Sequence, residues 1–389
     1  MATVDKFLEI HGDKILNDKR ILEADMLVFT LLSYANFEAL DITKKRNLHE
    51  KTCKLSIFFK NEYIEKLSSH YILPKSYAKF LTQLFKTKRY QDIEIGWFES
   101  ESDFNSAVQF FAMVFKTENY NFVIFRGTDI SIAGWKEDFH MAFNNPVLGQ
   151  VKSIDYVKKV SLLDDKTLIV LGHSKGGNLA YYSFLNSDDE IKKRIKRVYN
   201  FDGPAFKNDT YDYDKYKKKL TKFVPNDDVV GVLFEKSNNF EVIYSKKWNV
   251  FAHDMITWEF DKETNYKSFK RNKSGLSRSS KVLKISFDLW IKEVSYESAE
   301  DVTDFVFGIA LLNKQDNLLS LKNDVLKEMK FYFSKIIKYE PEKRKSVIKV
   351  CKEFVFIYFK VLINYKNYAE KFYKNKKIER KKVWKISTS

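Results

Sequence analysis

The sequence has little cysteine, and its two cysteines form no motif. Cys53 and Cys351 lie far apart, with no C-x-x-C spacing around either of them. A disulfide framework needs several cysteines, and a structural zinc site needs closely spaced thiols or imidazoles. The sequence therefore argues against both and indicates a reducing compartment.

Long apolar runs are absent as well. No stretch approaches the roughly 20 apolar residues that a helix needs to cross a bilayer. The first seven residues lack the basic segment followed by an apolar segment that is typical of a secretory signal peptide. We therefore expect a cytoplasmic protein without a signal peptide or transmembrane helix, whose only contact with a membrane would be peripheral.

Proline and glycine are too scarce to build a long flexible linker. The 389 residues include five prolines and twelve glycines. We also find no internal repeat. A chain of this length can form one large domain and a smaller one. Because the charged stretch 262–284 is the best boundary, we predict one domain over residues 1–265 and a helical, basic region over residues 266–389.

Acidic residues are outnumbered by basic ones, and the net charge is +16. Residues 366–389 hold nine Lys or Arg against two Glu, so nearly half of the net charge lies in this tail. The tail also carries aromatic side chains and lacks a recognised nucleic-acid motif. We therefore prefer an anionic membrane surface as its partner over nucleic acid, and a solvated helix end is the simplest alternative.

Apolar patterning predicts alternating strands and helices. Runs of branched and aromatic residues predict strands over 110–115, 121–126, 168–171, 198–202, 220–225 and 241–245, the first two forming a hairpin. Helical periodicity marks residues 24–35, 178–184, 316–339 and 345–365, and short helices are expected within 41–95. This alternation favours an α/β fold, with a mostly parallel sheet flanked by helices and a helical C-terminal extension.

The predicted chemistry centres on Gly172-His-Ser-Lys-Gly176, which lies between a predicted strand and a predicted helix. A G-x-S-x-G match in this context predicts a nucleophile elbow with Ser174 at its tip. Side chains two residues to either side of Ser174 would collide in so tight a turn, and Gly172 and Gly176 remove them. The alternative is a structural or phosphate-binding turn, since so short a motif also occurs by chance.

Six histidines are available as the general base that a serine nucleophile needs. His173 adjoins Ser174 in the chain, so its side chain is expected to point away. His253 lies in a loop after the last predicted strand, the position of the base in α/β enzymes with the chain order Ser…Asp…His. His11, His49 and His70 have no motif around them, and His140 follows a plausible helix, where a histidine is more often a satisfied surface residue. His253 is therefore the candidate base.

Two aspartates qualify as the acid that orients His253, because both follow predicted strands between the serine and the histidine. Asp228, with its neighbour Asp227, comes after the strand over 220–225, and Asp202 ends the preceding strand. The residue pattern leaves this choice open, and either aspartate could instead shape a turn.

Together these segments resemble the Mbeg1-like family of bacterial proteins, a domain of unknown function that is itself similar to the class 3 lipases of the α/β-hydrolase superfamily. The resemblance runs from about residue 20 to residue 320. It is carried, in chain order, by Ala24–Tyr34, Val123–Asp129, Gly134–Phe139, Gly172–Ala180, Arg197–Pro204, Val224–Gly231 and His253–Glu259.

The resemblance implies a role for each candidate residue. Thr128 matches the lipases' oxyanion residue. Its backbone N–H would hold an oxyanion together with the N–H of Lys175, and its hydroxyl is a candidate additional donor. The lipase acid aligns best with Asp228, which ranks Asp228 first and Asp202 second. Lys175 stands where the lipases usually have Leu, and its side chain would either favour an anionic acyl substrate or be solvated.

We therefore predict a serine esterase of the lipase type that cleaves an acyl ester through Ser174, His253 and Asp228, with an acyl-enzyme intermediate. A lipid ester is the more specific form of this prediction. No metal-ligand pattern is visible, and this mechanism needs neither metal nor cofactor. The alternative is a non-catalytic interaction or scaffold protein on a hydrolase fold, whose basic tail binds a membrane or nucleic acid.

Overall fold

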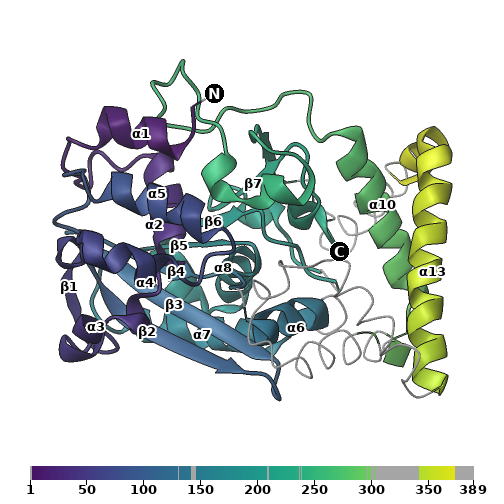
Figure 1. The fold of residues 1–389 in the computed structure, drawn as a ribbon, viewed down its shortest axis with the longest axis horizontal. Coiled ribbons are helices and arrows are strands. Elements are labelled where there is room, and N and C mark those ends of the chain that lie inside the picture. Colours follow the sequence, from purple (N-terminus) through teal and green to yellow (C-terminus); the bar gives the residue numbers. More distant parts are fainter. Residues whose placement is uncertain are drawn as a thin grey trace.

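An eight-stranded sheet forms the centre of the protein in the computed structural model (Figure 1), and its strand order follows the chain order. The structure describes residues 2–129, 131–141, 146–207, 210–235, 237, 239–295, 297–298, 302 and 341–372. The predicted helix over 316–339 and residues 373–389 of the basic tail lie outside these ranges.

The sheet combines an antiparallel edge with a parallel remainder. Its strands are β1 Thr52–Lys54, β2 Glu94–Asp103, β3 Val108–Lys116, β4 Tyr120–Phe125, β5 Thr167–His173, β6 Ile195–Phe201, β7 Leu220–Pro225 and β8 Glu241–Ile243. Strands β1 to β4 pair antiparallel, and β4 to β8 pair parallel. The predicted hairpin is β3–β4, and the four later predicted strands are β5 to β8.

Helices cover both faces of the sheet. The helices of the described residues are α1 Val4–His11, α2 Glu23–Leu32, α3 Asp41–Lys45, α4 Ile64–Ser68, α5 Pro74–Leu84, α6 Ile132–Met141, α7 Leu148–Ser161, α8 Lys175–Asn186, α9 Asp189–Arg194, α10 Arg278–Glu293 and α13 Pro341–Ile363. Short 3₁₀ helices span Phe37–Ala39, Leu55–Phe58, Asn61–Tyr63, Asp214–Tyr216, Val230–Val232, Asn249–His253 and Met255–Thr257. The predicted helices over 24–35, 178–184 and 345–365 correspond to α2, α8 and α13.

Two apolar cores lie on the two faces of the sheet. On one face α2 packs through Phe29, whose ring centroid lies 4.9 Å from those of both Phe115 and Phe122. On the other face α7 and α8 contribute Tyr156 and Leu179 to a second core. Burial on both faces explains why the parallel strands are almost continuously apolar. The α/β-hydrolase-like fold predicted from the sequence is therefore confirmed.

The prediction of only short helices within 41–95 is wrong for β1 and for the start of β2, which begins at Glu94. Residues 52–54 form the edge strand β1, which pairs with the start of β2. An edge strand of three residues shows too little alternation to be recognised, and its pairing depends on a partner some forty residues later in the chain.

A buried lysine links α10 to the segment that follows β7. Lys284 of α10 donates from Nζ to the carbonyls of Val232 and Glu235, at 2.8 and 2.9 Å. Helix α13 packs beside α10 (Figure 1), where the Trp290 indole N–H donates to the carbonyl of Val350 at 3.2 Å. Among the described helices, none has the length and apolar character to cross a bilayer.

Candidate functional site

Ser174 lies at the sharp turn between β5 and α8. Its backbone is in a left-handed region, with φ 57° and ψ −128°, which is costly for a residue with a side chain. The flanking glycines make the turn possible. A Cβ on Gly172 would lie 2.2 Å from the carbonyl oxygen of Gly176, and a Cβ on Gly176 would lie 2.1 Å from that of Phe125. This is the strand–turn–helix geometry that the motif predicts.

The segment that carries Thr128 lies directly against this turn. A Cβ on Gly127 would lie 3.2 Å from the Cβ of Ser174 and 2.5 Å from the carbonyl oxygen of His173. The Thr128 hydroxyl donates to Oδ2 of Asp138, at 2.5 Å. Thr128 is thus next to the serine, and its hydroxyl is engaged by a carboxylate.

Asp138 is a residue of this site that the sequence interpretation did not single out. Burial raises its pKa to about 6, although Lys175 and the hydrogen bond from Thr128 act in the opposite direction. Its Oδ1 is buried and has no hydrogen-bond partner among the described residues. The sequence feature that could have identified Asp138 is its position in the helical segment, ten residues after Thr128.

The imidazole of His253 has two buried carboxylates beside one of its nitrogens. Its Nδ1 is 2.7 Å from Oδ2 of Asp202 and 3.6 Å from Oδ2 of Asp228, and both aspartates are fully buried while His253 is 21% exposed. Asp202, ranked second from the sequence, therefore accepts the shorter hydrogen bond. Asp228 also accepts a hydrogen bond from the backbone N–H of Val230, at 2.8 Å.

Local geometry explains how two acids fit beside one imidazole. Asp202 has φ 55°, a conformation that Asp tolerates better than most side chains, and its N–H donates to the carbonyl of Phe223. A Cβ on Gly231 would lie 2.1 Å from Oδ1 of Asp202, so the glycine makes room for this carboxylate. The glycine three residues after Asp228 was a signal of this close approach.

The three groups shift one another's pKa values. Burial and the neighbouring charge of Asp228 raise the pKa of Asp202 well above its usual value. Burial opposes the charge of Asp228, but hydrogen bonding and attraction to His253 outweigh it and lower the pKa of Asp228. Burial likewise opposes the charge of His253, yet the two aspartates raise its pKa to about 10. Asp228 therefore holds the negative charge more firmly than Asp202 does.

His173 supports His253 from the other side. Its Nδ1 lies 2.8 Å from the hydroxyl of Tyr34, and its Nε2 lies 2.9 Å from the carbonyl oxygen of His253. Burial, with the nearby His253, lowers the pKa of His173 well below its usual value, so the ring is neutral. In this state Nε2 donates to the carbonyl while Nδ1 accepts from Tyr34. The expectation that His173 is structural agrees with these contacts.

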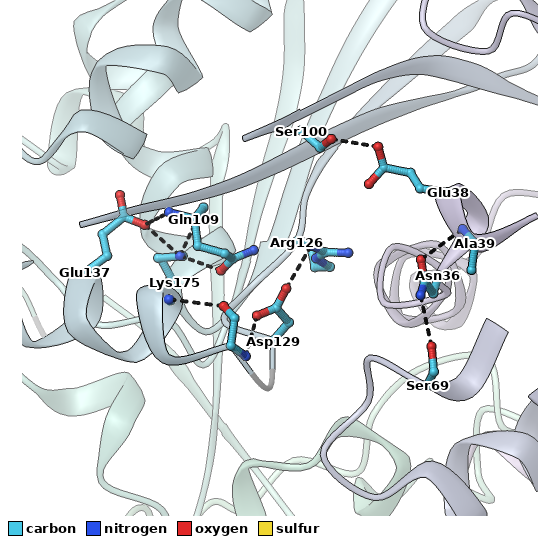
Figure 2. A network of polar contacts seen from close by, with 12 residues as sticks. Asn36, Glu38, Ala39, Ser69, Ser100, Gln109, Arg126, Asp129, Glu137 and Lys175 are labelled. Atoms are coloured by element: carbon cyan, nitrogen blue, oxygen red, sulfur yellow. Dashed lines mark hydrogen bonds and ion pairs between the residues drawn. The ribbon is translucent and has the colours of Figure 1, made fainter. Parts of the chain in front are cut away.

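The Lys175 side chain takes neither of the two positions expected from the sequence. It is 1% exposed, and its Nζ donates to Glu137 Oε2 at 2.8 Å and to both Oε1 and the carbonyl of Gln109, at 2.7 and 2.6 Å. Figure 2 shows these three side chains pointing toward one another. Glu137 also accepts from the N–H of Gly149. The lysine is thus neither solvated nor available to an anionic substrate, and it ties α8 to α6 and β3.

One group among the described residues has metal-ligand spacing. A ring nitrogen of His253 and one oxygen each of Asp202 and Asp228 all lie within 4.8 Å of one another. The hydrogen bond from Nδ1 to Asp202 already uses the nitrogen that faces the carboxylates. This arrangement fits an oriented imidazole, and the cluster coincides with the candidate acid–base pair.

Comparisons with known proteins were made at three levels. The model of the Mbeg1-like family matches residues 84–308, more than half of the chain. The curated pH-response regulator protein palA/RIM20 of Candida glabrata is 32% identical over 116 residues, and the match covers 29% of this chain but only 16% of that protein.

Several solved structures of lipases are similar to the chain. A Rhizomucor miehei lipase propeptide complex is 14% identical with a TM-score of 0.34, covering 68% of this chain and 76% of that one. M37 lipase is 19% identical with a TM-score of 0.33, covering 54% and 69%. Similarity at this level assigns no role to individual residues.

Proposed function

The chain belongs to the Mbeg1-like family, and on that premise we propose that it is a serine hydrolase of the esterase or lipase type that cleaves an acyl ester. Its nucleophile is Ser174 and its general base is His253. Asp202 and Asp228 together orient the imidazole, and the backbone N–H groups of Thr128 and Lys175 hold the oxyanion.

Ser174 attacks the ester carbonyl while its proton passes to Nε2 of His253. That nitrogen is the one available to accept the proton, because Nδ1 is engaged by Asp202 at 2.7 Å. The N–H of Lys175, at the first turn of α8, and that of Thr128 stabilise the tetrahedral oxyanion. His253 then returns the proton to the leaving alcohol, and water attacks the acyl-enzyme by the same route.

The observation that carries this proposal is the strained backbone of Ser174, whose chain neighbour His173 has its ring centroid 4.4 Å from that of the paired His253. A serine at φ 57° costs about 1–3 kcal/mol of folding free energy, which a purely structural turn could avoid with glycine. Strain of this kind is typical of a nucleophile that must stand above the sheet edge. A lipid ester is the more specific substrate that we propose, and the similarity of the family to class 3 lipases supports it.

Covalent labelling tests the proposal directly. A fluorophosphonate probe is expected to label the wild type and to leave Ser174→Ala unlabelled, because the probe reacts with an activated serine. Ser274→Ala, which removes an exposed serine outside the site, should label like the wild type. Activity is then measured on a series of short to long acyl esters, and Ser174→Ala should lose it throughout.

A folded wild type that neither labels nor cleaves any ester would refute the enzyme and favour the non-catalytic interaction protein. Circular dichroism and thermal unfolding on the same samples establish that the variants are folded. Labelling that persists in Ser174→Ala would move the nucleophile elsewhere in the chain.

A further inference from the structure

Helix α13 has two faces of different character. One face packs against α10 and its neighbours through Val347, Val350 and Val361, which are buried. The opposite face exposes five large apolar side chains, each between 37% and 78% exposed: Ile348, Val355, Phe356, Phe359 and Ile363. We call this set the outer stripe of α13.

The members of the outer stripe lie on one side of the helix. They are spaced seven, one, three and four residues apart from Ile348 to Ile363, which at about 100° per residue keeps them within one face of an α-helix. At 1.5 Å per residue the stripe extends over roughly 22 Å. Helix α13 forms the outer edge of the molecule, with α10 on its inner side (Figure 1).

Lysines are interleaved with the outer stripe. Lys345, Lys349 and Lys352 are exposed and spaced four and three residues apart, and Lys360, also exposed, directly follows Phe359. Within residues 341–363 there are six Lys or Arg against two Glu, a net charge of +4. The two glutamates contact Lys345 at 3.1 Å and Lys349 at 3.9 Å, and Lys360 lies 5.8 Å from the centre of the Phe356 ring.

We propose that the outer stripe of α13 docks the protein onto an anionic lipid bilayer surface. Apolar side chains on such a helix enter the boundary between head groups and acyl chains, while the lysines that border them bind the phosphates above. The helix would lie in the plane of the surface. This inference does not depend on the proposed hydrolase activity.

Charge and side-chain chemistry favour this partner over two others. A twofold pairing of two copies through the same stripe would bring the lysines of both copies together in an apolar interface, which is unfavourable. Nucleic acid would use the lysines but would leave Ile348, Val355 and Ile363 without a role. A bilayer with anionic head groups satisfies both kinds of side chain.

A natural thiol allows the contact to be observed. Cys351 is exposed on α13, whereas Cys53 is buried, so a polarity-sensitive thiol-reactive fluorophore will label Cys351. Its emission is expected to shift to the blue with vesicles of phosphatidylcholine and phosphatidylserine. Pure phosphatidylcholine vesicles should give a much smaller shift, and added salt should weaken the response, because the lysine contribution is screened.

Paired substitutions in the full-length chain test the stripe itself. Phe356→Ser with Phe359→Ser, and separately Lys352→Glu with Lys360→Glu, should each lower the affinity for the anionic vesicles by about tenfold or more in co-sedimentation. The matched controls are Leu162→Ser and Lys193→Glu, which change exposed residues of the same types at the end of α7 and on α9. Both controls should bind like the wild type.

Three outcomes would overturn the proposal. The first is a wild type that does not bind anionic vesicles. The second is binding that survives both α13 double variants but is lost when Lys381 and Lys382 of the basic tail are changed to Gln. The third is a wild type that sediments as a dimer without lipid, with the Phe356 and Phe359 changes converting it to a monomer. Ser174→Ala should bind vesicles normally, which separates this test from that of the hydrolase.

Discussion

His253 is the residue on which the candidate site depends most, and two carboxylates compete for its Nδ1. Asp202 has the shorter contact, 2.7 Å against 3.6 Å, while Asp228 holds its negative charge more firmly. Two buried acids this close do not both ionise readily, so the pair titrates as a unit. In the proposed mechanism Asp202 would supply the hydrogen bond and Asp228 the negative charge, two roles that a single triad aspartate combines.

Asparagine substitutions separate these roles. We expect Asp202→Asn and Asp228→Asn each to lower kcat/KM for a soluble ester by about 10- to 100-fold, since the other carboxylate remains. The double variant should approach the loss of about 10,000-fold that follows removal of a single triad acid. If one single variant already reaches the level of the double variant, that aspartate alone orients His253.

The same substitutions change the pH dependence of activity. His253 must be neutral to accept a proton, and the two aspartates raise its pKa to about 10, so activity should rise with pH on the alkaline side of neutrality. Removing the charge of Asp228 lowers the pKa of His253, and the rising limb of the kcat/KM profile should move to lower pH. A limb that stays in place would show that Asp228 carries no charge felt by His253.

At the scale of secondary-structure elements, the buried pair Lys175–Glu137 joins α6 and α8 beside the serine. Both side chains are fully buried, and Gln109 of β3 completes the cluster. A buried ion pair adds little net stability over an apolar pair, but loss of one partner leaves an uncompensated charge. The pair therefore fixes the position of α6, whose Asp138 engages Thr128.

Removal of one partner should be more harmful than removal of both. Lys175→Met is expected to lower the free energy of unfolding by about 3–5 kcal/mol, because Glu137 stays buried without its cation. Combining it with Glu137→Gln should recover part of this loss. Urea unfolding measures both variants, with Lys193→Glu as a surface control, and a single variant as stable as the wild type would contradict the prediction.

At the scale of the whole molecule, a buried and ionised glutamate lies where α10 meets the segment after β7. Burial opposes the charge of Glu235, but Lys222, at 2.8 Å, outweighs it and lowers the pKa to about 2, with Lys284 contributing. The ordinary pKa of glutamate is about 4.3. A lowered pKa stabilises the fold above the unfolded value, and this stabilisation is lost as the pH falls from about 4.5 toward 2.

Acid should therefore loosen the attachment of the C-terminal helices. Glu235→Gln is expected to be less stable than the wild type at pH 7 by about 3 kcal/mol, since Lys222 loses its partner. The difference between the two proteins should shrink as the pH approaches 2. Thermal unfolding at a series of pH values tests this, and a difference that does not change with pH would contradict it.

Local sequence patterns determined the elbow, the later strands of the sheet and the identity of the candidate base. Strand, tight turn and helix are specified by residues close together in the chain, as around Ser174. Parallel strands also bring their carboxyl ends to one edge, which is why Asp202, Asp228 and His253 could all be named as candidates. The order of the strands in the chain is the order in the sheet, so no distant rearrangement obscured the pattern.

Tertiary packing decided what spacing along the chain cannot express. The packing of β6, β7 and the loop before His253 brings both aspartates to His253. The same packing decides which aspartate lies closer. The burial of Lys175 depends on Glu137 and Gln109, which come from other elements. The outer stripe of α13 points away from the molecule because the opposite face of the helix packs against α10. In each case residues far apart in the chain form the surroundings of a side chain. A local sequence pattern does not specify which distant residues these are.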